Sequence, residues 1–225
     1  MSSQLSPTPR STPRREKDRA QSSREALHEV LDASLICHLA VVVDGVPLAL
    51  PTVFAVDLDG PDEAGTLYLH GSVASRSLRQ APDQDVSVTM TVLDGMVLAR
   101  SGFNHSMNYR SAVVIGRPRV VSDEAERAHA LDLLVDHAAP GRAATLRRPT
   151  RKELAATTVL ALPLDEASVK RRTGDPTDED ADIEAGGVWA GVLPLRLTAG
   201  DPVTSADAVD VPVPEHVTRR AAGLA

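Results

Sequence analysis

The chain has 225 residues, of which 42% are hydrophobic and 24% charged, so its composition is that of a globular protein with a buried core. A formal net charge of −7 argues against a nucleic-acid partner, which normally requires a basic face. One cysteine, Cys37, excludes an internal disulfide and a cysteine-cluster metal site, and its surroundings favour a buried small hydrophobe. No apolar stretch is long enough for a membrane span and the N-terminus is polar, so we expect a cytoplasmic protein without a membrane partner.

The N-terminal region divides into a polar stretch and a helix. Residues 1–21 are rich in Ser, Pro and Arg and are predicted to form a flexible arm. Ser22 and Glu25 have the spacing of a capping box, and apolar residues follow at helical intervals. This pattern predicts a helix over about 23–33.

Short apolar runs alternate with turn signals over most of the remaining chain, which is typical of β-strands joined by hairpins. Asp44-Gly45 and Asp94-Gly95 are predicted to be hairpin turns. The predicted strands are 36–43, 46–56, 66–70, 85–95, 96–102, 106–121, 157–164 and 188–197. With few helices between them, they favour an antiparallel barrel or sandwich with helices packed outside, in one domain over 22–200.

Helices are predicted after Ser75, after a cap at Ser122, and after the capping-box pair Thr150 and Glu153. The second of these carries one apolar stripe, formed by Ala128, Leu131, Leu134, Val135 and Ala138. The charged stretch after Asp165 is predicted to be a solvated loop, with Glu166 and Lys170 forming an ion pair. Residues 201–225 are predicted to be an irregular tail.

An anion site is predicted where the strand at 66–70 ends. Gly71 would allow a tight turn, after which the hydroxyls of Ser72 and Ser75 and the guanidinium of Arg76 would converge with free amide groups of a helix start. The alternative interpretation is a strand, a turn and a surface helix with a solvated arginine.

Five sequence blocks, taken together and in order, carry a resemblance to a known family. They are CHLAVVVDGVPLALPT, LYLHGSVASRS, VTMTVLDGMVLARSGFNHSMNYRSAVVIGRPR, ATTVLALPLDEASVKRRTG and VWAGVLPL. Over about residues 14–197, the chain resembles the pyridoxamine 5′-phosphate oxidase-like flavin-nucleotide-binding proteins of the FMN-binding split-barrel superfamily, particularly the branch with nitroimidazole-resistance proteins. This resemblance implies a mainly β fold, a six-stranded antiparallel split β-barrel with helices packed outside, that forms a homodimer with FMN in clefts between the subunits.

The resemblance also implies which residues contact the flavin. Ser72, Ser75 and Arg76 would hold its phosphate, and His70 and Gly71 would lie beside the ribityl chain or the ring. The full implied set is Pro51, Thr52, His70, Gly71, Ser72, Ser75, Arg76, Tyr109, Arg110, Ser111 and Trp189.

The remaining implied contacts lie on three other segments. Pro51 and Thr52 would offer backbone groups to the isoalloxazine edge, and the segment from Tyr109 to Ser111 would reach the phosphate or the flavin. Trp189 resembles the Trp of a Trp-Gly-Gly-type strand that approaches the flavin from the partner subunit, with Ala190 in place of the first Gly. Structural alternatives stay open, because Arg110 could form a surface ion pair and Trp189 could be a core residue.

The function implied by the resemblance is that of an FMN-dependent, nitroreductase-like oxidoreductase acting on a small organic substrate stacked on the flavin, with His70 as a candidate proton donor. An F420- or haem-binding protein on the same barrel, or a flavin carrier or sensor without turnover, are the alternatives. Oxidation of pyridoxamine phosphate itself is disfavoured, because the C-terminal segment has Arg196 but no Arg-x-His pair. Roles for Lys170, Arg171 and Arg172 stay open, Arg172 being a candidate substrate contact.

Overall fold

The computed structural model describes residues 3–5 and 8–224 of the chain. Its contacts divide the chain into two compact units. Unit 1 comprises the described residues of Met1–Ser34, Thr89–Val114 and Glu166–Arg196, and unit 2 comprises Leu35–Val88, Ile115–Asp165 and the described residues of Leu197–Ala225. Each unit is therefore assembled from segments that are distant in sequence.

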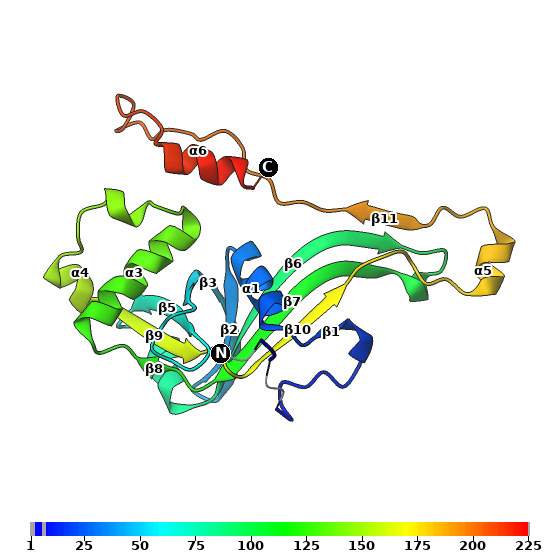
Figure 1. The fold of residues 1–225 in the computed structure, drawn as a ribbon, viewed down its shortest axis with the longest axis horizontal. Helices are drawn as coiled ribbons and strands as arrows, with labels where there is room; N and C mark the ends of the chain where they lie inside the picture. Colours follow the sequence, from blue (N-terminus) through cyan, green and yellow to red (C-terminus); the bar gives the residue numbers. More distant parts are fainter. Residues whose placement is uncertain (1–2, 6–7, 225) are drawn as a thin grey trace. The chain divides into compact units, whose positions relative to one another are not determined.

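The elements are mostly antiparallel strands, as predicted (Figure 1). The strands are β1 Ala20–Gln21, β2 Cys37–Val43, β3 Val46–Thr52, β4 Phe54–Asp57, β5 Thr66–Ser72, β6 Val86–Leu98, β7 Ser106–Gly116, β8 Arg119–Val120, β9 Thr157–Pro163, β10 Ala167–Arg172 and β11 Gly191–Pro194. The helices are α1 Arg24–Ala33, α2 Arg76–Gln80, α3 Glu124–Ala138, α4 Arg151–Ala155, α5 Asp180–Ala185 and α6 Glu215–Ala222. Short 3-10 turns are η1 Lys17–Arg19, η2 Ala81–Asp83, η3 Gly102–Asn104 and η4 Ala143–Thr145.

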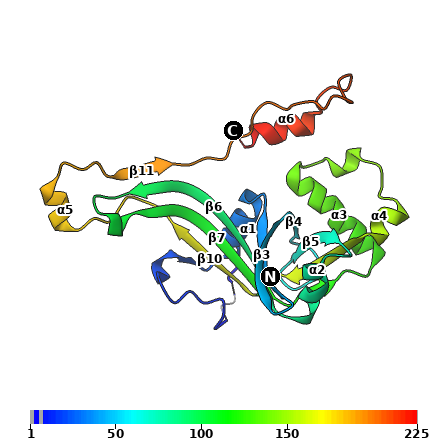
Figure 2. The same ribbon diagram turned by 180° about the vertical axis from the view of Figure 1, so that it is seen from behind.

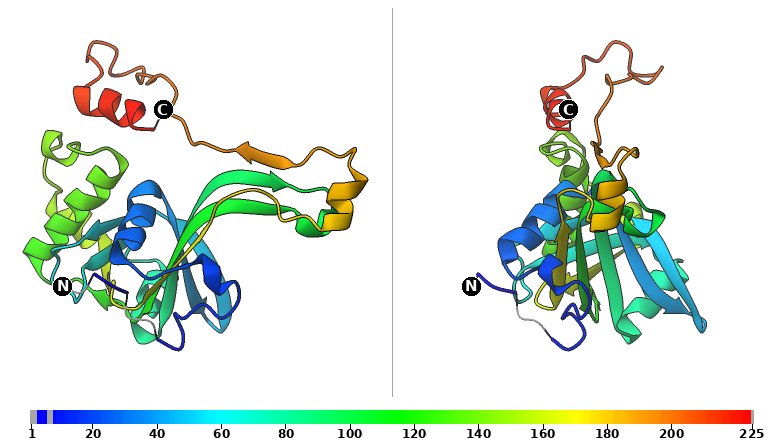
Figure 3. Two further views of the ribbon diagram at one scale, coloured as in Figure 1. Left: turned by 45° about the vertical axis from the view of Figure 1, so that its right-hand side comes forward. Right: turned by 90° about the vertical axis from the view of Figure 1, so that its right-hand side faces the viewer.

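Unit 1 is built on neighbouring antiparallel strands in the order β1, β10, β7 and β6, with β11 added along β6. β10 runs beside β7 along its whole length (Figure 3). The predicted hairpin turn at Asp94-Gly95 is wrong, because β6 passes through both residues without a break. Asp94 instead binds Arg110 of β7, and a Cβ atom at Gly95 would lie 2.9 Å from Val192 of β11. Gly95 therefore allows close strand packing and does not form a turn.

The start of the charged stretch after Asp165 forms β10, so the predicted solvated loop is wrong there. Ala167 and Val169 are buried on one face, and polar residues alternate with them. The predicted ion pair of Glu166 with Lys170 is also wrong, since Glu166 binds Arg10 at 2.6 Å and Lys170 donates to the Arg15 carbonyl at 2.7 Å. Four residues along a strand span far more than one helical turn, so the two side chains are not neighbours.

The described part of the predicted N-terminal arm carries local structure and contacts within unit 1. η1 and β1 lie in it, and β1 pairs with β10 in the register Ala20 to Lys170. Thr8 and Arg10 both donate to the carboxylate of Glu166. Residues 1–2 and 6–7 of this prediction lie outside the described part of the chain.

Side-chain caps define the helix starts. Ser23 accepts a hydrogen bond from the Ala26 amide at 3.2 Å, so the cap of α1 lies one residue after the predicted Ser22. Asp123 caps α3 in place of the predicted Ser122. The capping box of Thr150 with Glu153 at α4 is confirmed.

Unit 2 contains the predicted β2–β3 hairpin and a sheet in the order β4, β5, β9 and β8. Asp44 and Gly45 have φ values of 51° and 81°, as a two-residue turn between twisted strands requires, so this hairpin prediction is confirmed. α3 packs on β4, β5 and β9 (Figure 1), and α2 and β4 are seen most clearly in Figure 2. Ala130 of α3 packs with the side chains of Tyr68, Val121, Val159 and Ala161 in a buried cluster.

The C-terminal tail contains α6, so the prediction of an irregular segment after residue 200 is wrong over Glu215–Ala222. Arg220 of this helix donates hydrogen bonds to the carbonyl groups of His137 and Ala138 at the end of α3. A cation at a helix C-terminus is favourable because the last carbonyl groups have no partner within the helix. None of the described helices has the length and apolar character needed to cross a membrane.

Candidate functional site

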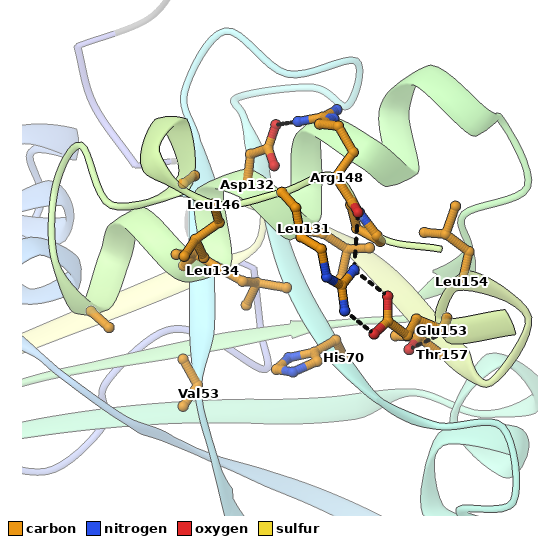
Figure 4. A pocket seen from close by; sticks show the side chains of 15 residues that line it. Val53, His70, Leu131, Asp132, Leu134, Leu146, Arg148, Glu153, Leu154 and Thr157 are labelled. Atoms are coloured by element: carbon orange, nitrogen blue, oxygen red, sulfur yellow. Dashed lines mark hydrogen bonds and ion pairs between the residues drawn. The ribbon is translucent and has the colours of Figure 1, made fainter. Parts of the chain in front are cut away.

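Unit 2 contains a pocket of about 600 Å³, within the range of roughly 300–1,000 Å³ that is typical of small-molecule and cofactor sites. It is lined by residues of α3, of the connection from α3 to α4, and of α4 (Figure 4). Val53 between β3 and β4, His70 of β5 and Thr157 of β9 complete the lining. Its lining residues are Val53, His70, Leu131, Asp132, Leu134, Val135, Ala138, Ala143, Leu146, Arg147, Arg148, Pro149, Glu153, Leu154 and Thr157. All of these residues belong to unit 2.

The apolar stripe of α3 supplies one wall of the pocket. Leu131, Leu134, Val135 and Ala138 all line it, whereas only Leu134 of the predicted stripe is fully buried. Two further lining residues are partly open to solvent, since Leu146 is 44% exposed and Val53 is 36% exposed. Apolar side chains are therefore left open to an occupant rather than covered by protein.

His70 lies at the floor of the pocket, where β5 passes beneath α3 (Figure 4). Its Nδ1 atom is buried without a hydrogen-bond partner, and neither ring nitrogen has a partner among residues 3–5 and 8–224. Burial lowers the pKa of His70 from its ordinary value of 6.5, so the imidazole is neutral at pH 7. A neutral imidazole offers a nitrogen lone pair, and a buried nitrogen without a partner costs about 1–3 kcal/mol unless a ligand satisfies it.

Two arginine–carboxylate pairs occupy the rim of the pocket. Arg147 binds both oxygens of Glu153, at 2.6 and 2.9 Å, and Arg148 binds Asp132 at 2.6 Å. The Arg147 guanidinium and the capping hydrogen bonds of Thr150 lower the pKa of Glu153 to about 2, so its carboxylate stays ionised. The rim therefore carries two guanidinium groups whose charges are balanced.

Gly71 has a different role from the predicted turn. It lies within β5, pairs with Thr158 of β9, and is followed by Ser72 in the same strand. A Cβ atom at this position would approach Leu78 Cδ1 to 2.7 Å. Gly71 thus lets α2 pack closely against β5.

The predicted phosphate-binding groups follow directly but make local hydrogen bonds. Ser75 caps α2, with its hydroxyl accepting from the Leu78 amide at 3.5 Å, and the Ser72 hydroxyl accepts from the Ala74 amide at 3.2 Å. Arg76 is 67% exposed and forms an ion pair with Asp44 at the β2–β3 turn. Three donors for an anion are thus present on one exposed turn, and the arginine already has a carboxylate partner.

The other predicted contacts in unit 2 lie at the end of β3. Pro51 pairs with His38, and Thr52 pairs with Cys37. Thr52 directly precedes Val53 of the pocket lining. Cys37 is fully buried and burial raises its pKa to about 12, which confirms its assignment as a small buried hydrophobe.

Tyr109, Arg110 and Ser111 lie on β7 in unit 1, opposite Arg172, Arg171 and Lys170 of β10. Arg110 makes a bidentate contact with Asp94, with distances of 2.8 and 3.1 Å. This hydrogen-bonded pair raises the pKa of Arg110. Arg110 therefore forms an ion pair with Asp94, which was the structural alternative to a flavin contact.

Arg172 donates to the Asn108 side chain and to the carbonyl groups of Gly174 and Asp175, so its guanidinium holds the end of β10.

Trp189 of unit 1 is 67% exposed and precedes β11. A Cβ atom at Gly191 would lie 2.9 Å from the indole Cζ2 atom, so the absence of a side chain at Gly191 leaves room for one edge of the ring. The core-residue alternative for Trp189 is wrong, because most of its surface is exposed.

Sequence reasoning missed most of the pocket. The residues Leu131 and Leu134 were predicted only as a packing stripe, and the rim residues Arg147, Arg148 and Asp132 were not singled out. The run Leu146–Arg147–Arg148–Pro149 was a usable signal, since it combines an apolar residue with two arginines before a helix cap. Within the described residues, no group of three or more His, Cys, Asp or Glu side chains could hold a metal ion.

Comparison with known proteins relates this chain to one family and to two structures over nearly its whole length. A family model described as pyridoxamine 5′-phosphate oxidase matches residues 23–171. The structure of the flavocytochrome Anf3 from Azotobacter vinelandii is 36% identical, with a TM-score of 0.87, covering 96% of this chain and 98% of that chain. The structure of the FAD and heme binding protein from Mycobacterium smegmatis is 42% identical, with a TM-score of 0.81, covering 90% of this chain and 97% of that chain.

A more distant structure extends the comparison of fold. A 5-nitroimidazole antibiotic resistance protein from Bacteroides thetaiotaomicron, described with its function as provisional, is 21% identical, with a TM-score of 0.54, and covers 67% of this chain and 85% of that chain. A search of curated proteins found no significant match. The matched model covers most of the chain and two structures exceed 30% identity over nearly all of it. The chain therefore belongs to the pyridoxamine 5′-phosphate oxidase family, whose split-barrel fold it shares.

Proposed function

We propose that this protein binds a flavin and uses it in an oxidoreductase reaction on a small organic molecule. The observation that carries the proposal is the similarity, over almost the whole chain, to a flavocytochrome and to an FAD- and haem-binding protein. Flavin would supply the electron chemistry, while the protein binds and orients the ring and its substrate.

The flavin contacts that we propose are those implied by the family resemblance. In unit 2 they are Pro51, Thr52, His70, Gly71, Ser72, Ser75 and Arg76, and in unit 1 they are Tyr109, Arg110, Ser111 and Trp189. Support comes from the hydroxyl and guanidinium donors on the β5–α2 turn and from the exposed indole of Trp189, which is free to stack. We further propose a homodimer, in which Trp189 would approach the flavin of the partner subunit.

Two flavin nucleotides, FMN and FAD, are candidates for the bound cofactor. FMN carries a terminal phosphate dianion, whereas FAD extends beyond its phosphates into an adenosine, which needs additional surface. The Mycobacterium smegmatis relative is described as binding FAD, so the experiment has to distinguish FMN from FAD.

The test is purification without added cofactor, followed by absorbance spectroscopy and mass spectrometry of the extracted cofactor. We expect a yellow protein that contains about one flavin per subunit. Colourless protein that takes up neither FMN nor FAD would contradict the proposal. A deazaflavin mass would instead establish the F420 alternative, and bound flavin with no turnover of NAD(P)H and nitroaromatic acceptors would indicate a carrier or sensor.

A second candidate function, haem binding, is favoured by a specific observation. Of the structures similar to almost the whole chain, one is described as a flavocytochrome and another as an FAD and heme binding protein. The pocket beneath α3 has the volume, the apolar walls and the unpartnered histidine that a haem would require. A Soret band after reconstitution with hemin, in a protein that also retains flavin, is the expected result.

A further inference from the structure

We propose that the pocket of unit 2 is a haem site in which His70 supplies an axial nitrogen ligand and the rim arginines Arg147 and Arg148 bind the propionates. This inference rests on the haem-binding function proposed above and assigns its residues. Under this inference His70 binds the haem iron rather than the flavin, so it replaces the flavin contact proposed above at this one residue.

The first argument is the shape and polarity of the pocket. Its walls are mainly the side chains of Leu131, Leu134, Val135, Leu146 and Leu154, and its volume is about 600 Å³. Haem is a flat, largely apolar molecule with two carboxylates at one edge, so it needs apolar walls and a polar rim. The pocket has both, because Arg147 and Arg148 lie on the α3–α4 connection and their partners Glu153 and Asp132 lie on α4 and α3 (Figure 4).

The second argument is the state of His70. Its ring has no hydrogen-bond partner among the described residues, and Nδ1 is shielded from solvent. Most buried polar groups in native proteins are satisfied, so a buried Nδ1 atom without a partner at the floor of a pocket indicates a partner that binds there. A neutral imidazole is an iron ligand, whereas an imidazolium is not, and burial among apolar residues keeps this ring neutral.

The third argument is the arrangement of charge at the rim. Arg147 and Arg148 are adjacent in sequence and each holds one carboxylate, Glu153 and Asp132 respectively. Both pairs are largely exposed, so their interaction is weak and exchangeable. Two ligand carboxylates could therefore take the places of Asp132 and Glu153, and a dianionic edge would match two guanidinium groups.

The ligand experiment is titration of the full-length protein with hemin, with absorbance and electron paramagnetic resonance spectra as readouts. In His70→Ala we expect loss of the nitrogen-ligated spectrum and an affinity for hemin at least about tenfold weaker, because one coordinate bond is lost. In His70→Gly, added imidazole should restore the wild-type spectrum. The matched control is His129→Ala, since His129 lies on α3 and pairs with Asp57 but does not line the pocket.

The second experiment changes the rim residues and expects opposite changes in hemin affinity for the two partners of one ion pair. Arg148→Gln should weaken hemin binding by about tenfold or more, while Asp132→Asn should strengthen it, because it frees Arg148 from its partner. A purely structural role for the pair would instead weaken binding in both variants. Arg151→Gln, on α4 and outside the pocket, is the charge-matched control.

The outcomes separate this inference from the proposed functions. Wild-type protein that takes up flavin but no hemin overturns both haem binding and this site, while flavin binding stands. Wild-type protein that binds hemin with a spectrum unchanged in His70→Ala overturns only the ligand assignment. Circular dichroism and the urea unfolding transition establish that the variant is folded, and His70→Gln replaces His70→Ala if it is not, with the same loss expected.

Discussion

Two arginine-bearing regions of unit 2 look alike in sequence but differ in structure. At the β5–α2 turn, Arg76 lies on the surface, bound to Asp44, and the hydroxyl of the neighbouring Ser75 caps a short helix. At the α3–α4 connection, Arg147 and Arg148 border a pocket with a half-buried histidine at its floor, whose Nδ1 atom has no partner. Both regions can bind an anionic group, but only the second also offers enclosed apolar surface. A donor set recognises a charge, whereas a cavity selects the body of the ligand that carries it.

Occupying the pocket should have the largest effect. In Leu146→Trp, the indole would fill the space beside α3 from a side chain that is 44% exposed, so little stability should be lost. We expect hemin binding to weaken by about a hundredfold, from the cost of overpacking, with flavin content unchanged. Hemin titration and flavin absorbance on the same sample measure both. Val120→Trp, on β8 and outside the pocket, is the control; loss of flavin in Leu146→Trp alone would show that the pocket serves the flavin instead.

Removing the guanidinium at the β5–α2 turn should have a smaller effect on the flavin. Arg76→Ala should weaken FMN binding by about 1.5–3 kcal/mol if Arg76 makes a charged hydrogen bond to the phosphate. That corresponds to roughly a tenfold to 150-fold increase in Kd. Fluorescence titration with FMN measures the change.

Two variants test this assignment. Asp44→Asn should strengthen FMN binding, because it frees Arg76 from its ion pair. Arg79→Ala, at the other end of α2, should change little. Unchanged affinity in Arg76→Ala would remove Arg76 from the flavin site.

A change in the packing of the same turn should alter stability more than binding. Gly71→Ala places a methyl group 2.7 Å from Leu78 Cδ1, which requires a shift of that side chain or of α2. We expect a loss of about 1 kcal/mol in the free energy of unfolding in urea. Gly102→Ala, where nothing lies within 4 Å, should be neutral. Equal stability of both variants would show that α2 shifts freely on β5.

The smallest expected effect is the pH dependence of the ligand-free protein. Burial lowers the pKa of His70 below 6.5, so the unfolded chain takes up its proton first as the pH falls. This contribution to stability is present above pH 6.5 and decreases below it, down to the folded pKa. The melting temperature of His70→Gln should therefore decrease less between pH 7 and pH 5 than that of wild type. Identical slopes would mean that His70 is solvated in the ligand-free protein.

The sequence predicted several elements because their signals are local. The positive φ values at Asp44 and Gly45 and the Thr150–Glu153 capping box depend on residues within one turn, so the pattern was sufficient. Asp94-Gly95 has the same local signal as Asp44-Gly45, but the pairing of Asp94 with Arg110 and the approach of β11 keep β6 extended. In that case distant residues outweighed the turn preference.

Residue order alone determined membership of the family, the mainly antiparallel β class, the buried state of Cys37 and the presence of donors after β5. Tertiary structure decided which apolar face stayed uncovered. Periodicity indicates that Leu131, Leu134, Val135 and Ala138 share one side of a helix, but it carries no information on whether protein or a cavity faces them. The sequence likewise could not predict that the buried Nδ1 atom of His70 lacks a hydrogen-bond partner, because this depends on every element packed around the ring.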